Sequence, residues 1–137
     1  MPVFPSQEWC EALIAAIHSE PDSLKAGRGF KGDLAAVVLP EPPACKEPFA
    51  VWANADEGKV TGFRVLEDLD EIEEVGPAYV ARATYSTWKK MILGELDAIE
   101  AVIRRQIEVD GDLQPILERA HFKELLRRVL SRVPTTF

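Results

Sequence analysis

The clearest pattern of apolar and polar positions lies in the second half of the chain. Residues 79–85 alternate between two faces with a period of two, which predicts a strand with one polar position, Arg82, on its outer face. From Ser86, whose hydroxyl suits an N-cap, the period becomes that of a helix. Apolar side chains then recur at the i, i+3 and i+4 spacing that places them on one helical face: Trp88, Met91 and Ile92.

A second short helix is predicted directly after the first. Gly94 is a natural end for the first helix, because glycine adopts the left-handed conformation at low cost. Asp97 and Glu100 form a variant of the capping box and predict a new helix start. The apolar side of this helix carries Ile99, Val102 and Ile103. A further strand is predicted over residues 107–113, so two short amphipathic helices lie between two strands.

The rest of the chain supplies the remaining elements. Ser6 caps a first helix with apolar positions at Trp9, Leu13 and Ile17, and a helical turn is predicted at 22–26. Three apolar runs predict strands, the last two as an antiparallel hairpin: 34–39, 49–55 and 60–66. The acidic residues 67–74 predict a solvated loop or a single helical turn. Two helices complete the chain, one capped by Asp112 and one with apolar positions at Phe122, Leu125, Leu126, Val129 and Leu130.

Three segments of this pattern combine in a recognisable order. They are residues 87–90 (Thr-Trp-Lys-Lys), 94–97 (Gly-Glu-Leu-Asp) and 107–113 (Ile-Glu-Val-Asp-Gly-Asp-Leu). Their order and spacing resemble the sterol carrier protein 2 family of lipid-binding domains, and fainter likeness extends upstream to residues 29–32 and into the Leu-rich end. One difference is the segment 104–106, Arg-Arg-Gln, where the family often has a Gly-Lys pair. The resemblance therefore does not predict the turn at this point.

The resemblance implies an α+β fold with a five-stranded, mainly antiparallel sheet covered by helices, and an apolar tunnel between helices and sheet. It implies one domain over residues 1–137 that binds sterol-like or other long-chain lipids without catalysis. On pattern alone, the apolar stripes are more typical of an ordinary packed core. Taken with the resemblance, the predicted lipid contacts are Trp88, Met91, Ile92, Val102 and Ile103, with Leu117, Phe122 and Leu126 as a lid. Arg82 and Lys89 are candidates for contact with an anionic head group.

Composition and charge exclude several function classes. The 137 residues are 47% hydrophobic and 28% charged, as in ordinary soluble domains. A net charge of −7 argues against nucleic acid as a partner and predicts at most transient contact with anionic membranes. No apolar run reaches the roughly 20 residues of a membrane span, and residues 1–8 do not form a secretory signal. Because Cys10 and Cys45 form no disulfide framework, we expect a cytoplasmic protein.

Residues suited to catalysis or metal binding are few and scattered. His18 and His121 have no Cys, Asp or Glu at metal-ligand spacing, and no serine lies in a Gly-x-Ser-x-Gly elbow. The glycines of 27–32 do not form a phosphate-binding loop. Cys10 is expected to be a small buried hydrophobe, and Cys45 a free surface thiol. We therefore predict no catalytic residue, no metal ion and no cofactor.

Two other function classes stay open. The basic C-terminal helix suits docking to an acidic partner or to a second copy of the chain, as in a homodimer. Alternatively, the same cavity could hold an apolar substrate for an accessory reaction, which requires a carboxylate with a raised pKa aimed into the cavity. An all-apolar lining would argue against that enzyme.

Overall fold

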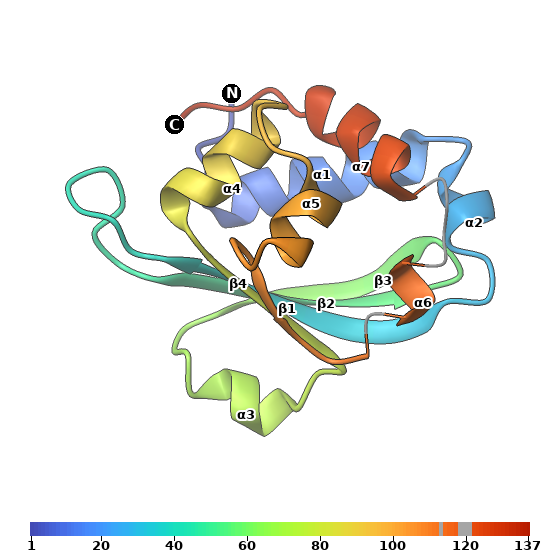
Figure 1. Ribbon diagram of the computed structural model, residues 1–137, viewed down its shortest axis with the longest axis horizontal. Helices are drawn as coiled ribbons and strands as arrows, with labels where there is room; N and C mark the ends of the chain where they lie inside the picture. Colours follow the sequence, from blue (N-terminus) through green and yellow to red (C-terminus); the bar gives the residue numbers. More distant parts are fainter. Residues whose placement is uncertain (113, 118–121) are drawn as a thin grey trace.

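A five-stranded sheet with helices on both faces forms the frame of the computed structural model (Figure 1). The structure describes residues 1–112, 114–117 and 122–137, with the backbone alone at residues 26, 116, 122 and 123. Across the sheet the strands are β3 (Lys59–Leu66), β2 (Phe49–Asp56), β1 (Lys31–Leu39), β4 (Tyr79–Thr84) and β5 (Glu108–Asp110). The neighbours β1 and β4 are parallel, and the other three pairs are antiparallel. The predicted α+β class and mainly antiparallel five-stranded sheet are confirmed.

The two faces of the sheet carry unequal helical layers. Four helices lie on one face: α1 (Gln7–Ser19), α4 (Tyr85–Ile92), α5 (Ala98–Ile103) and α7 (Phe122–Ser131). The single helix α3 (Glu71–Val75) lies on the other face, and two short helices lie toward one end of the sheet, α2 (Ser23–Ala26) and α6 (Gln114–Leu117) (Figure 1). The amide of Phe4 donates to the carbonyl oxygen of Thr136 at 2.9 Å, so the first and last residues lie side by side.

Three of the predicted helix caps are confirmed. Ser6 Oγ accepts a 3.1 Å hydrogen bond from the amide of Trp9, and the Asp97 carboxylate accepts one of 3.0 Å from Ile99. Asp112 Oδ1 likewise accepts from the amide of Gln114 at 3.1 Å. These bonds fix where α1, α5 and α6 begin, because each satisfies a first-turn amide that has no partner within the helix.

Helix α4 begins differently from its prediction. Ser86 is not the cap, because the helix already begins at Tyr85 and Ser86 lies in its first turn. The amide of Ser86 instead donates to Glu41 Oε1 at 2.7 Å, from the loop that follows β1. This hydrogen bond, with others from Ser86 and Thr84, lowers the pKa of the Glu41 carboxyl. A distant loop therefore supplies the cap that local sequence cannot show.

The turn between β2 and β3 agrees with the predicted hairpin, and the last strand is shorter than predicted. Between β2 and β3, Glu57 (φ 53°) and Gly58 (φ 87°) both adopt positive φ, as in the turn that best joins twisted antiparallel strands. The predicted strand 107–113 is observed only as Glu108–Asp110, followed by Gly111 at φ 126°. Leu113 lies outside the described residues.

Buried apolar side chains form one cluster on the α3 face of the sheet and two on the other. The α3-face cluster contains Ala35, Val37, Ala50, Leu66, Ile72 and Val80. On the other face, a first helical cluster contains Phe4, Trp9, Cys10, Val38, Cys45, Tyr85 and Val133. A second helical cluster contains Ala83, Met91, Ala101 and Ile107.

Candidate functional site

The central strand β1 is covered unequally on its two faces. Ala35 and Val37 point toward α3, and each is 1% exposed. The alternating residues Leu34 and Ala36 point toward the larger helical layer, yet Leu34 is 37% exposed and Ala36 is only half-buried. Because β1 has a strand on either side, exposure at Leu34 reflects room above the sheet rather than an open edge. On this face Leu34 and Ala36 are therefore less completely covered than Val38, which is 4% exposed at the other end of the strand.

Strand register extends this half-buried area to the neighbouring strands. Leu34 pairs with Ala53 of β2, and Ala36 pairs with Ala81 of β4. Paired residues share a face of the sheet, and all of these alanines are half-buried. We call Leu34, Ala36, Ala53 and Ala81 the sheet floor. Three of its four side chains are single methyl groups, which fill little of the space between sheet and helices.

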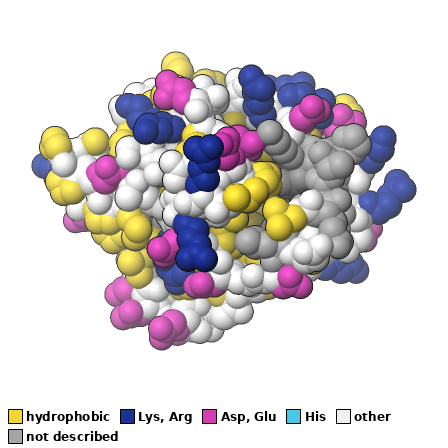
Figure 2. Space-filling view, in the orientation of Figure 1, with side chains coloured by type: hydrophobic (Ala, Val, Ile, Leu, Met, Phe, Trp, Pro, Cys, Tyr) yellow, Lys and Arg dark blue, Asp and Glu magenta, His cyan; other side chains and the backbone are white. Residues whose placement is uncertain are grey.

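Several apolar side chains of α5, α6 and α7 are partly or largely exposed. Val102 on α5 is half-buried against the second helical cluster, whereas Ile103 is 71% exposed. Leu117 on α6 is 47% exposed, and Leu126 on α7 is half-buried. Figure 2 shows hydrophobic side chains at the surface in the centre of this view, over α5 and beside it. A gathering of exposed apolar side chains is typical of a binding surface.

The α4 residues lie deeper than those of α5. Trp88 packs against both helical clusters, and its indole Nε1 donates a 2.9 Å hydrogen bond to the carbonyl oxygen of Val37. Met91 is buried in the second helical cluster, and Ile92 packs against the first. These three predicted contacts are thus parts of the packed layer that borders the floor.

The structure brings some predicted site residues together and separates others. Trp88, Met91 and Val102 meet in the second helical cluster, whereas Ile92 belongs with the first. Ile103 does not share the buried side of α5; the position with 0% exposure there is Ala101. The predicted side-chain contact at Phe122 falls outside the described part of the chain.

Sequence reasoning missed the sheet floor. It predicted residues 34–39 as a strand from their apolar run alone, and it assigned no role in the site to the alanines of β2 and β4. The available signal was the run of small residues at alternate positions, Gly32, Ala36, Ala53, Ala55 and Ala81. Small residues on one face of a sheet let that face stay open under a helical layer.

Arg82 and Lys89, the two candidates for contact with an anionic head group, each already have another partner. Arg82 alternates with Ala81 and Ala83, so it lies on the α3 face, where its Nη1 is 2.7 Å from Asp110 Oδ2. Its suggested place at the mouth of the apolar space is therefore wrong. Lys89 Nζ lies 4.9 Å from the ring centroid of Phe137, in a cation–π contact.

The thiols and His18 have structural surroundings. Burial, assisted by the charge of Glu11, raises the pKa of Cys10 to about 11, so its thiol is protonated at neutral pH. Cys45 is buried rather than at the surface as predicted, and its Sγ donates to the carbonyl oxygen of Glu47 at 3.3 Å. His18 Nε2 accepts a 3.0 Å bond from the amide of Val60. No group of three His, Cys, Asp or Glu in the described part could hold a metal ion.

A separate open groove lies at the loop between β1 and β2. Its volume is about 500 Å³, and it is lined by Pro5, Pro43, Ala44, Cys45, Lys46, Glu47, Pro48 and Phe49. Charged and proline side chains make up much of this lining, unlike the alanine-rich sheet floor. Among the described helices, none is both long enough and apolar enough to cross a membrane.

Comparison with solved structures identifies the architecture. A crystal structure of sterol carrier protein 2 is 24% identical with a TM-score of 0.80, covering 94% of this chain and 98% of the other. A protein from Thermus thermophilus, described as a candidate sterol carrier protein, is 23% identical with a TM-score of 0.78, over 96% of this chain and 90% of its own. Palmitated SCP2L2 from Aedes aegypti is 14% identical with a TM-score of 0.51, over 90% and 91%.

Sequence comparison alone does not reach this result. No protein-family model matches the chain, and no curated protein matches it. The likeness lies in the arrangement of the elements, with the matching structures spanning almost the whole of both chains. The chain has the sterol carrier protein 2 fold, which confirms the architecture that the sequence resemblance predicted.

Proposed function

We propose that the chain binds one long-chain lipid with its apolar tail on the sheet floor, and that it does so without catalysing a reaction. The observation that carries the proposal is the contrast within β1: Leu34 is 37% exposed on the helix-covered face, whereas Ala35 and Val37 are 1% exposed on the other. An apolar surface left open beneath helices is covered at a gain in free energy by another apolar group. A lipid tail supplies such a group.

The expected gain is sufficient for binding. Each buried methylene contributes about 0.8 kcal/mol, so a tail that buries about ten of them gains about 8 kcal/mol before the cost of immobilisation. Apolar contact discriminates weakly between tails of similar length. We therefore propose a broad ligand class of fatty acids, fatty acyl-CoA and sterols, carried or transferred between membranes by transient contact.

Each predicted site residue has a place in this proposal. The tail lies on Leu34 and the floor alanines, with Val102, Ile103, Leu117 and Leu126 beside it and Phe122 as part of a lid. Trp88, Met91 and Ile92 hold α4 at its distance from the sheet. The similar structures support this ligand class, since two are described as actual or candidate sterol carrier proteins and one as palmitated.

A non-enzymatic role agrees with the acidic and thiol groups of the described residues. Glu20 is the buried carboxylate among them, and it pairs with two arginines rather than facing the floor. The Cys10 thiol is protonated at neutral pH, as its raised pKa requires. We propose that residues 1–137 act as one lipid-binding domain of the cytoplasm.

The exposed apolar side chains support one other candidate. Ile103 and Leu117 are 71% and 47% exposed, and a second copy of the chain would shield them in a homodimer. In that case the surface over α5 is a protein interface and no lipid is needed to cover it.

Native mass spectrometry of the purified protein, followed by titration with fluorescent fatty acid, acyl-CoA and sterol analogues, tests the proposal. We expect one ligand per chain, and loss of uptake in Leu34→Trp, whose indole fills the floor. The matched control is Ala44→Trp in the groove beside Pro43, which should bind as the wild type does. Uptake of none of the three probes, with a mass that doubles as concentration rises, would replace the lipid proposal with the homodimer.

A further inference from the structure

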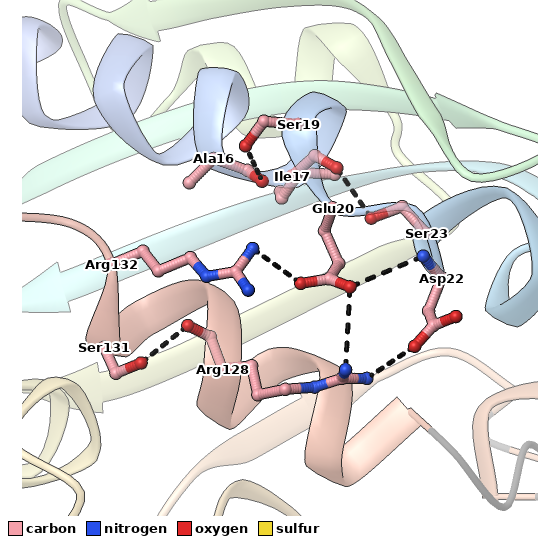
Figure 3. Close-up of polar contacts among 9 residues, drawn as sticks. All are labelled: Ala16, Ile17, Ser19, Glu20, Asp22, Ser23, Arg128, Ser131 and Arg132. Carbon is pink, nitrogen blue, oxygen red and sulfur yellow. Dashed lines mark hydrogen bonds and ion pairs between the residues drawn. The ribbon is translucent and has the colours of Figure 1, made fainter.

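A buried carboxylate connects α7 to the end of α1. Glu20 is the C-terminal cap residue of α1, and its side chain is 3% exposed. Two arginines lie within ion-pair distance of it: Arg128 in α7, and Arg132 directly after the helix ends at Ser131 (Figure 3). The contact joins elements that lie more than a hundred positions apart in the sequence.

Each oxygen of Glu20 has its own arginine. Arg132 Nη1 lies 2.7 Å from Oε2, and Arg128 Nη1 lies 3.6 Å from Oε1. The geometry of the Arg132 contact is that of an ion pair and not of a hydrogen bond. Among the described residues, none donates a hydrogen bond to Oε2. Arg128 also donates to Asp22 Oδ2 at 3.0 Å, so one guanidinium joins two acidic groups.

This arrangement is costly without both arginines. A carboxylate at a helix C-terminus meets the negative end of the helix dipole, and burial removes the water that would otherwise solvate it. Buried ion pairs add little net stability compared with apolar contacts, but removing one partner leaves an uncompensated charge. The two ion pairs therefore favour the position of α7 in which both arginines reach Glu20.

Local hydrogen bonds hold both sides of the contact rigid. Ser23 Oγ donates to the carbonyl oxygen of Ile17 at 2.6 Å, which closes the turn after α1, and Ser131 Oγ donates to the carbonyl oxygen of Arg128 at 2.7 Å (Figure 3). The inner side of α7 is packed, with Val129 at 1% exposure and Leu125 at 9%. The packed apolar side of α7 and the charged contact at Glu20 therefore both join this end of the chain to the rest of the fold.

We propose that Glu20 is a positioning residue that holds α7 as the outer wall of the lipid space and thereby sets how fast a bound lipid leaves. The inference rests on the proposed function, because α7 carries Leu126, one turn before Leu130 of the first helical cluster. Weakening the ion pairs lets α7 move away from α1 without removing any apolar side chain from the floor.

Glu20→Gln keeps the shape of the side chain and removes its charge. We expect a C16 fluorescent fatty acid to leave this variant about tenfold faster in stopped-flow transfer to phosphatidylcholine vesicles, since one partner of a buried pair is lost. The control is Asp22→Asn, which removes only the exposed partner of Arg128 and should change the rate less than about twofold. Amide hydrogen exchange should rise selectively in α7 of the Glu20 variant.

A second pair of variants keeps the test decisive if Glu20→Gln folds poorly. Arg132→Lys retains the charge and should release lipid more slowly than Arg132→Met. A Glu20 variant that melts at lower temperature but keeps the wild-type release rate and α7 exchange would overturn the inference, because its role would be structural only. Failure of the wild type to bind the probe would overturn the proposed function and the role in release, while faster α7 exchange would still show that Glu20 positions the helix.

Discussion

The indole Nε1 of Trp88 donates a 2.9 Å hydrogen bond to the backbone carbonyl oxygen of Val37. The bond links α4 to the central strand, and the Trp88 side chain packs against both helical clusters. A large side chain fixed at this point holds α4 above the sheet while the floor alanines beside it stay half-buried. Trp88 thus acts as a spacer between helix and sheet.

Trp88 should report lipid binding by fluorescence. The other two indoles are remote from the floor: Trp9 donates to Thr135 Oγ1 within the first helical cluster, and Trp52 donates to Asp33 on the α3 face. In a Trp9→Phe, Trp52→Phe double variant, added palmitate should shift the remaining emission to shorter wavelength. An unchanged spectrum, with palmitate shown to be bound by mass spectrometry, would place the ligand elsewhere.

A substitution at Ile103 should lower lipid affinity with little effect on stability. At 71% exposure it contributes little to the core, so Ile103→Asp should change the free energy of unfolding by less than about 0.5 kcal/mol. A charge at this position should nevertheless lower fatty-acid affinity at least about tenfold, because burial of a carboxylate beside the tail is unfavourable. Urea denaturation and fluorescence titration measure the two quantities.

Lys90→Asp is the matched control for this substitution. Lys90 is exposed on α4, away from the buried Met91. The Lys90→Asp variant should bind fatty acid as the wild type does. Equal loss of affinity in the Ile103→Asp and Lys90→Asp variants would mean that net charge, rather than contact at Ile103, governs uptake.

Asp33 should make the free energy of unfolding depend on pH in the acidic range. Burial acts to raise its pKa, but hydrogen bonds from Trp52 Nε1 (2.8 Å) and the amide of Ala78 (2.9 Å) outweigh burial, and the pKa of Asp33 is lowered. A carboxylate with a lowered folded-state pKa stabilises the fold above its unfolded pKa of about 3.9, and this stability is lost as pH falls through the folded value.

Asp33→Asn removes that contribution. We expect the variant to be about 1 kcal/mol less stable at neutral pH, and to lose less stability than the wild type on acidification below about pH 4. Urea denaturation at a series of pH values gives both results. Parallel stability curves for the two proteins would show that Asp33 does not titrate with folding.

The buried thiols should react slowly in the native protein. Because the pKa of Cys10 is about 11, only about one thiol in a thousand at this position is a thiolate at pH 8. Cys45 is shielded by burial, since it is 8% exposed. Iodoacetamide should therefore modify both cysteines at least about a hundredfold faster in urea than in buffer. Rapid single alkylation of the folded chain would identify a reactive thiol and favour an enzymatic role.

The sequence pattern was sufficient for elements whose determinants are local. The caps at Ser6 and Asp97 and the hairpin at Gly58 all follow from a few adjacent residues. Where a distant group decides, local reasoning was wrong: Glu41 caps α4, and Ala101 rather than Ile103 faces the core. Arg105, at φ 61°, adopts the left-handed conformation at the turn where the resembling family often has glycine.

The candidate site was harder to predict because it depends on both faces of one strand. Helical spacing predicted that Trp88 and Met91 share one face of α4 and that Val102 lies on the apolar side of α5, and all three pack in the second helical cluster. The openness at Leu34 depends instead on how far helices from three parts of the chain stand from the sheet. No pattern within residues 34–39 distinguishes a strand buried on two faces from a strand buried on one.

The most direct test of the central claim is an intermolecular NOE measurement with palmitate and methyl-labelled protein. Alternate residues of β1 and β4 provide the internal control, because their side chains point to opposite faces of the same sheet. The account predicts NOEs from palmitate methylenes to the methyl groups of Leu34, Ala36 and Ala81, and none to those of Ala35 and Val37. NOEs to Ala44 of the separate groove, with none to Leu34, would contradict it.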